Sequence, residues 1–144
     1  LMTDSTNTPS SNWARYAPRS VAPLLLDLFG IVTFILVGAG QHSISDGAGW
    51  FFMVLWPLAT GWYLVAIATR LYAATDRMWT RLVITWVAGT LVASVLRGSF
   101  TDRPMFSIFT VIFMAWMVLI AFGWRGIARV LALRKQRRRR TKKN

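Results

Sequence analysis

Few side chains in this sequence could carry out acid–base chemistry. The 144 residues include five aspartates, one histidine, no glutamate and no cysteine. Asp27 falls inside an apolar stretch that ends at the sole histidine, His42. A lone histidine without cysteine or glutamate does not make a metal site, and Ser43, His42 and Asp46 are too close in sequence to form a catalytic triad readily. We therefore expect no metal, no cofactor and no catalytic residues, and we predict that the protein is not an enzyme.

The elements that must position these residues are long apolar stretches. The chain is 55% hydrophobic and only 15% charged, and about twenty apolar residues are enough to cross a bilayer as a helix. Four such stretches predict an all-α, polytopic membrane protein with transmembrane helices at about 21–41, 50–69, 82–99 and 105–123.

The segments outside these spans are polar or basic. We predict a flexible polar segment at 1–20, a four-helix transmembrane domain at 21–126, and a basic cytoplasmic tail at 127–144. Met2 is the expected start of the natural chain. The first span should be a retained helix and not a cleaved signal peptide, because its apolar region is long and three further spans follow.

The distribution of basic residues predicts the orientation in the membrane. With both termini in the cytoplasm, inside segments carry 2 + 3 + 10 = 15 Lys and Arg residues, and outside segments carry only Arg97 and Arg103. This follows the positive-inside rule, and four spans also require both termini on one side. We expect a multi-pass protein of the plasma (inner) membrane with both termini cytoplasmic.

Asp27 is the candidate intramembrane charge. It lies roughly 7–10 Å inside the first span at a rise of 1.5 Å per residue, where a carboxylate costs a few kcal/mol unless it is paired or protonated. Arg97 is too far away, about 15–20 Å along the membrane normal, so Arg70 and Arg81 are the predicted partners. A structural ion pair, an ion- or proton-linked role and a helix-start contact are the three interpretations.

A second group of polar residues is predicted at the outer side, where it could bind a small anion or a lipid headgroup. The alternative is a set of ordinary interfacial residues, with an arginine that reaches the headgroups. The members of this outer polar cluster are Gln41, His42, Asp46, Arg97, Asp102 and Arg103.

Small residues and the tail provide two further expectations. Membrane helices place small residues against one another, which predicts helix packing at Gly30, Gly38, Pro57, Gly61 and Gly89. Basic residues near a membrane surface attract anionic headgroups. We predict anionic-lipid contacts by Arg134, Lys135, Arg137, Arg138, Arg139, Arg140, Lys142 and Lys143.

Several of these positions together resemble a known family. The matching features are Asp27, Gly38 with His42, Pro57 with Gly61-Trp62, Gly89 with Arg97, Phe106–Phe109, and Gly123-Trp124-Arg125. Over about residues 22–126 the chain is similar to a prokaryotic family of small four-helix membrane proteins, common in actinobacteria, that is catalogued as a domain of unknown function. The family usually has basic residues before the histidine, whereas this chain has Ala39-Gly40-Gln41. The resemblance implies the architecture and no activity.

These observations favour a function through packing. The leading hypothesis is a non-enzymatic accessory or assembly subunit. The alternatives are a small oligomeric carrier with Asp27 as a titrating group, and an outer-face lipid-modifying enzyme, which the scarcity of acid–base residues disfavours. Expected partners are the bilayer with its anionic headgroups, and either another membrane protein or further copies of the chain. Nucleic acid is not an expected partner, because no aromatic residues interleave the basic tail.

Overall fold

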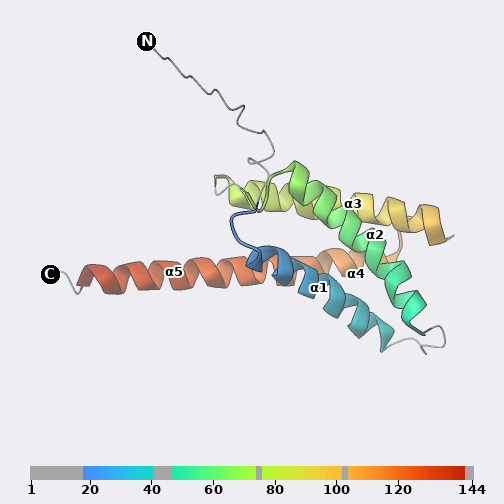
Figure 1. Ribbon diagram of the computed structural model, residues 1–144, viewed down its shortest axis with the longest axis horizontal. Helices are drawn as coiled ribbons and strands as arrows, with labels where there is room; N and C mark the ends of the chain where they lie inside the picture. Colours follow the sequence, from blue (N-terminus) through green and yellow to red (C-terminus); the bar gives the residue numbers. More distant parts are fainter. Residues whose placement is uncertain (1–17, 41–46, 74–75, 102–103, 142–144) are drawn as a thin grey trace, which may run out of the picture.

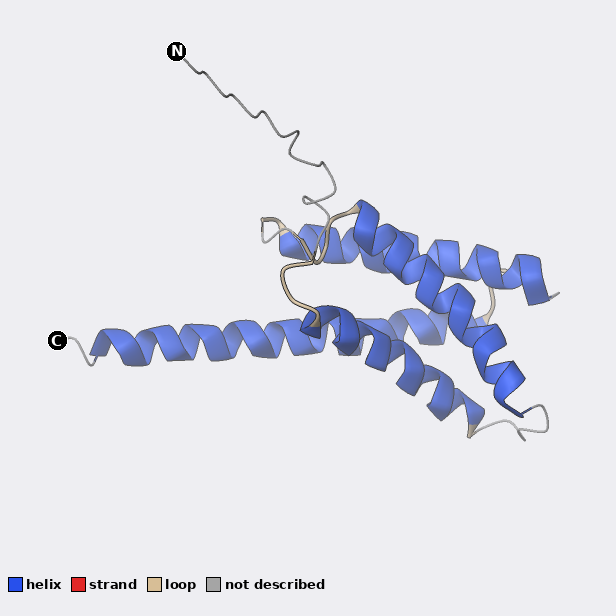
Figure 2. Ribbon diagram, viewed as in Figure 1, coloured by secondary structure: helices blue, strands red, loops and turns tan. Residues whose placement is uncertain are grey.

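The chain forms an all-helical bundle. The computed structural model describes residues 18–40, 47–73, 76–101 and 104–141, and within these ranges it contains helices and no strands (Figure 2). Four helices are long and apolar enough to cross a membrane. The predicted fold class is confirmed, and the elements in chain order are α1 (Ala22–Ala39), α2 (Gly47–Ala68), α3 (Met78–Thr101), α4 (Ile108–Met117), η2 (Val118–Phe122) and α5 (Gly123–Thr141).

The helix that forms the fourth span continues far beyond residue 123, the predicted end of the span. A five-residue π-helix, η2, joins α4 directly to α5, and α5 continues the direction of α4 out of the bundle (Figure 1). The apolar side chains Ile127, Val130 and Leu131 extend the hydrophobic part of the helix past Arg125. Hydropathy drops at Gly123-Trp124-Arg125, but backbone hydrogen bonding does not depend on that drop, so the helix continues.

The π-helix keeps one row of side chains on the bundle. The buried residues of this long helix are Thr110, Phe113, Met117, Ala121 and Arg125, and the last four are spaced by four. Such a row drifts around an α-helix of 3.6 residues per turn, and the wider i→i+5 turn of a π-helix offsets the drift. The fourth span therefore contributes one row of side chains to the core.

The closest helix contact is between α2 and α3. A Cβ atom added to Gly61 would lie 2.5 Å from the Ala93 nitrogen and 2.6 Å from its Cα atom. On the opposite helix, a Cβ added to Gly89 would lie 3.3 Å from the Trp62 Cα atom. Membrane helices use such small residues to bring backbones together, so these two glycines define where α2 and α3 cross.

The other three predicted packing positions differ from one another. Pro57 is buried, and a Cβ on Gly30 would meet the Ile120 side chain of η2 at 2.6 Å. A Cβ on Gly38 would meet nothing within 4 Å. The prediction for Gly38 is therefore wrong, because no other described helix approaches α1 closely at this position.

The chain reverses sharply after α2. Arg70 adopts a left-handed backbone with a φ of 57°, the Leu71 amide donates to the Ala66 carbonyl at 2.9 Å, and the Arg70 amide donates to the Ile67 carbonyl at 2.9 Å. This pair of bonds is a Schellman motif, which commonly includes a hydrophobic contact beside it; Leu71 and Ala66 are both buried. The motif carries the next residue, Tyr72, back toward α1.

Candidate functional site

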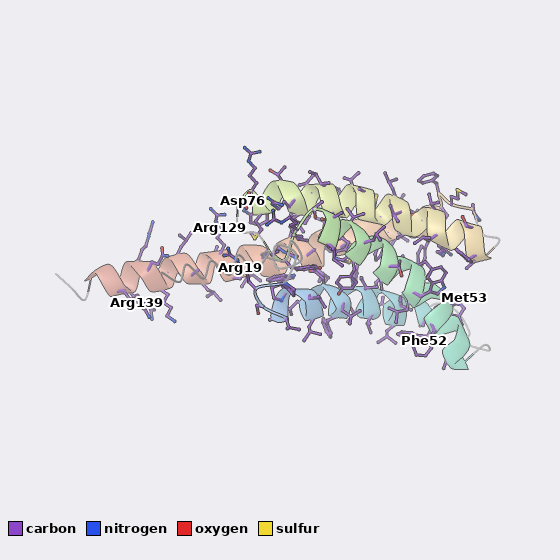
Figure 3. The ribbon with its side chains drawn as sticks, turned by 45° about the horizontal axis from the view of Figure 1, so that its top comes forward. Arg19, Phe52, Met53, Asp76, Arg129 and Arg139 are labelled. Atoms are coloured by element: carbon purple, nitrogen blue, oxygen red, sulfur yellow. The ribbon has the colours of Figure 1, made fainter. Side chains whose placement is uncertain are left out.

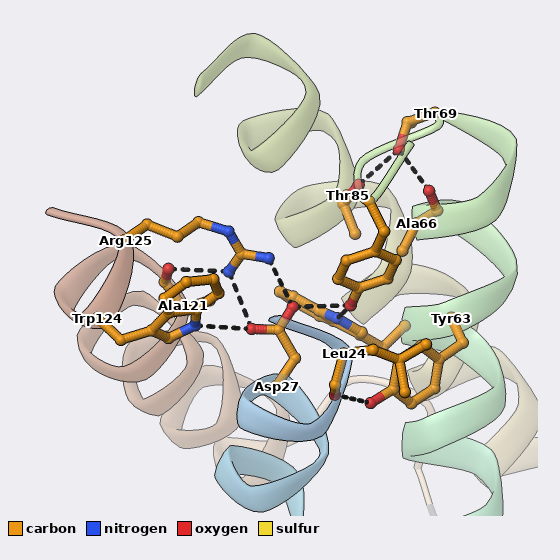
Figure 4. A network of polar contacts seen from close by, with 11 residues as sticks. Leu24, Asp27, Tyr63, Ala66, Thr69, Thr85, Ala121, Trp124 and Arg125 are labelled. Atoms are coloured by element: carbon orange, nitrogen blue, oxygen red, sulfur yellow. Dashed lines mark hydrogen bonds and ion pairs between the residues drawn. The ribbon is translucent and has the colours of Figure 1, made fainter. Parts of the chain in front are cut away.

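The centre of the candidate site is a buried ion pair between α1 and α5. The Arg125 guanidinium donates through Nη1 to Asp27 Oδ1 at 2.9 Å and through Nη2 to Asp27 Oδ2 at 2.8 Å (Figure 4). The exposed fractions of the two side chains are 3% and 0%. A two-point contact of this kind fixes orientation as well as distance, so the pair joins the first span to the fourth in one geometry.

Two further side chains complete the hydrogen bonding of the Asp27 carboxylate. The Trp124 indole donates to Asp27 Oδ1 at 3.0 Å, and the Tyr72 hydroxyl donates to Asp27 Oδ2 at 2.7 Å. Tyr72 in turn accepts a bond from the Trp62 indole at 3.1 Å. Each carboxylate oxygen thus accepts two hydrogen bonds, and no buried side-chain nitrogen or oxygen in the described residues lacks a partner.

The local structure of four segments places these groups. Asp27 lies in the second turn of α1, and Trp62 lies on α2. Tyr72 follows the Schellman turn, and Arg125 is held by a bond from its Nη1 to the Ala121 carbonyl one turn earlier, at 2.9 Å. We call these five side chains, Asp27, Trp62, Tyr72, Trp124 and Arg125, the carboxylate network.

Burial and the charge of Asp27 keep the hydroxyl of Tyr72, the network residue in the α2–α3 loop, protonated. Burial raises the pKa of the Tyr72 hydroxyl far above its ordinary value, and the nearby negative charge of Asp27 raises it further. Removing a proton from a buried phenol beside a carboxylate would place two negative charges together in a poorly solvated site. Tyr72 therefore remains a hydrogen-bond donor to Asp27 at physiological pH.

The predicted partners of Asp27, Arg70 and Arg81, are wrong. Arg81 instead pairs with Asp76 at 2.9 Å in the exposed α2–α3 loop, and its Nε donates to the Asp76 carbonyl. The hydrogen bond and positive charge of Arg81 lower the pKa of Asp76, and Arg70 adds a smaller contribution in the same direction. Arg81 thus bonds to the α2–α3 loop, and the positive charge that pairs with Asp27 inside the bundle is that of Arg125.

Sequence analysis did not identify Arg125 as the partner of Asp27, because Arg125 follows the predicted end of the fourth span at residue 123. One signal could have identified it. Apolar residues continue after it at Ile127, Val130, Leu131 and Leu133, so the arginine lies inside an apolar helix. The end of span four and the start of span one also lie on the same side of the membrane, which places Arg125 and Asp27 at similar depth.

Most of the predicted outer polar cluster lies outside the described residues. Gln41, His42, Asp46, Asp102 and Arg103 belong to segments that are not described. Arg97 is described, and its guanidinium carbon lies 4.0 Å from the centroid of the Phe109 ring. In the described ranges no group of three or more metal-ligating side chains gathers.

The predicted lipid-contacting residues belong to the projecting helix. Arg134, Lys135 and residues 137–139 are exposed on α5, while the side chains of Arg140, Lys142 and Lys143 lie outside the described part of the chain. Figure 3 shows Arg139 on this projection and Arg19 and Arg129 at the same end of the bundle, with Phe52 and Met53 at the other end. Anionic-lipid contact by the tail remains a prediction.

Replacement of Tyr72 by phenylalanine tests the loop contact. Tyr72→Phe removes one donor from Asp27 and leaves the Trp62 indole without its acceptor, so we expect a loss of about 1–2 kcal/mol in unfolding free energy. Chemical unfolding in mixed detergent micelles, followed by tryptophan fluorescence, would measure it. Tyr63→Phe is the matched control, because the Tyr63 hydroxyl donates its hydrogen bond to a backbone carbonyl, that of Leu24 at 2.7 Å, and not to the Asp27 carboxylate, so its loss should cost less.

The fold and the network define the class of this molecule as a multi-pass membrane protein with four spans and a buried charge pair between the first and the last. The chain belongs to the family described as "Protein of unknown function (DUF3054)", whose profile matches residues 24–128. This range includes the whole carboxylate network and ends before the basic part of α5. No curated protein and no solved structure matches the chain.

Proposed function

We propose that this protein is a non-enzymatic accessory or assembly subunit of the plasma (inner) membrane, with both termini in the cytoplasm. The observation that carries the proposal is the saturation of Asp27, whose oxygens accept four hydrogen bonds from Arg125, Trp124 and Tyr72. A fully bonded and fully buried carboxylate favours one arrangement of the helices and has no free position for a substrate.

The outer face of the fourth span supports the same proposal. Large apolar side chains on it are exposed, among them Ile108, Val111, Ile112 and Leu119. Lipid would cover such a face, and so would a helix of another membrane protein, through van der Waals packing. A carrier would need Asp27 to exchange its partners during transport, and a lipid-modifying enzyme would need an acid–base group near the bilayer surface. The saturated network disfavours the first, and the described residues provide no support for the second.

Site-specific photo-cross-linking in native membranes tests the accessory role. A photoreactive residue at Val111 on α4 is compared with one at Val37 on α1, because their exposed fractions are similar, at 62% and 57%. We expect Val111 to yield one heteromeric adduct of defined mass, Val37 to yield none, and native mass spectrometry to recover the same partner at fixed stoichiometry without cross-linking. A clean monomer by both methods would refute the accessory role.

A further inference from the structure

A small notch opens at the end of the bundle where the arginines collect. It has a volume of about 160 Å³ and lies between the start of α1 and the end of α2, with Leu24, Ala66 and Ile67 among its lining residues. Ile67 is 55% exposed beside it, so the notch opens onto the surface that faces lipid. Its walls are almost entirely apolar, which suits a hydrocarbon chain better than a polar solute.

Two arginines flank this notch. Arg70 is part of its lining, as is Pro18. Arg19 follows Pro18 directly, and its backbone amide donates to the Tyr72 carbonyl at 3.2 Å, which ties the segment before α1 to the loop after α2. Arg19 is exposed, and Arg70 is half-buried. An arginine has five N–H donors, so each can bind a phosphate in addition to a protein group.

The charged and apolar residues around the notch follow the order of the parts of a phospholipid. Leu24 precedes Asp27 by three residues, which places it about 4–5 Å closer to the membrane surface at a helical rise of 1.5 Å per residue. Arg19 lies before α1 begins and Arg70 lies after α2 ends. Arg19 and Arg70 therefore lie closer to the membrane surface than Leu24 and Ile67, just as the phosphate of a phospholipid lies closer to the surface than its acyl chains.

We propose that this notch is a binding site for one anionic phospholipid, with the upper part of an acyl chain against Leu24 and Ile67 and the phosphate between Arg19 and Arg70. Basic pockets between transmembrane helices are known to select anionic headgroups. The occupied site would connect α1 to α2 close to the carboxylate network. The inference does not depend on the accessory role, because a carrier or an isolated bundle could have the same lipid site.

Native mass spectrometry of the full chain tests this site. The protein in detergent is given equal amounts of phosphatidylglycerol and phosphatidylcholine with identical acyl chains, and the lipid adducts are counted. We expect the wild-type chain to retain one phosphatidylglycerol in preference to phosphatidylcholine. Arg70→Asn and Arg19→Gln should each weaken that adduct about five-fold, from about 1 kcal/mol per arginine near the surface.

Arg77→Asn is the matched control for Arg70→Asn, because the two arginines have similar backbone conformations. Arg70 and Arg77 are both arginines with a positive φ, 57° and 48°, and asparagine tolerates that conformation. Arg77→Asn thus removes the same charge at the same end of the molecule, away from the notch. We expect Arg77→Asn to retain the wild-type adduct, and the melting temperatures of both variants are measured so that weaker lipid binding is distinguished from a loss of folding. Equal losses in the two variants, or no preference for phosphatidylglycerol in the wild-type chain, would overturn the proposal.

A competition experiment with inorganic phosphate distinguishes a bound phospholipid from a bound free anion. Excess inorganic phosphate should leave the phosphatidylglycerol adduct in place, because phosphate lacks the acyl chain that the apolar walls contact. Displacement of the lipid by phosphate would overturn the assignment of the notch to a phospholipid.

Discussion

Asp27→Asn and Arg125→Met should each destabilise the protein by about 3–5 kcal/mol, because removal of one member of a buried ion pair leaves the other charge without compensation. Methionine retains much of the arginine stem, so Arg125→Met changes charge and hydrogen bonding more than packing volume. In Asp27→Asn, the Arg125 guanidinium also loses its two-point contact. Chemical unfolding in mixed micelles should show both variants with a lower free energy of unfolding than the wild-type chain.

The exposed ion pair of the same protein is the control for this expectation. Asp76 and Arg81 are also 2.9 Å apart, but the Asp76 side chain is 68% exposed, and such surface pairs contribute about 0–1 kcal/mol. Asp76→Asn should therefore change stability little. If Asp27→Asn were as mild as Asp76→Asn, the carboxylate network would not hold the bundle together.

Gly61→Ala should destabilise the protein by about 3 kcal/mol, at the upper end of the usual cost of overpacking. The added methyl group would lie 2.5 Å from the Ala93 nitrogen and 2.7 Å from its Cβ atom. No side-chain rotation can relieve a contact with backbone, so α2 and α3 must separate. The separation would also disturb Trp62, the neighbour that supports Tyr72.

Gly38→Ala, the same substitution on α1, should stabilise the protein instead. Gly38→Ala meets nothing within 4 Å, and alanine in a helix is favoured over glycine by roughly 0.5–1 kcal/mol. Thermal melting of the two variants in one detergent separates the effects. If the Gly61→Ala variant were as stable as the Gly38→Ala variant, the close contact between the α2 and α3 backbones at Gly61 would be contradicted.

The helical architecture could be predicted from sequence because lipid requires it. A chain in hydrocarbon must satisfy its backbone within each span, so long apolar stretches specify helices with few alternatives. The isolated position of Asp27 also identified it as a candidate site, since a carboxylate in such a stretch is costly unless it is paired. These arguments depend on the solvent and on local composition, and both can be read directly from the sequence.

The partner of Asp27 could not be predicted in the same way. Arg70 and Arg81 were preferred because hydropathy ended the fourth span at residue 123, and Arg125 lies two residues beyond that point. The contact joins residues 98 positions apart, and it depends on the π-helix that keeps Arg125 on the inner face. Periodicity at 3.6 residues per turn does not predict a local π-helix, so the register of the last helix was not accessible.

A double-mutant cycle between Asp27 and Arg125 tests the central claim, that this pair joins the first span to the last, most directly. Unfolding free energies are measured for wild type, Asp27→Asn, Arg125→Met and the double variant, and the same cycle is repeated with Arg81→Met. We predict a coupling of about 2 kcal/mol between Asp27 and Arg125, within the range found for residues in contact, and none between Asp27 and Arg81. Zero coupling in the first cycle, or a larger coupling in the second, would contradict the account.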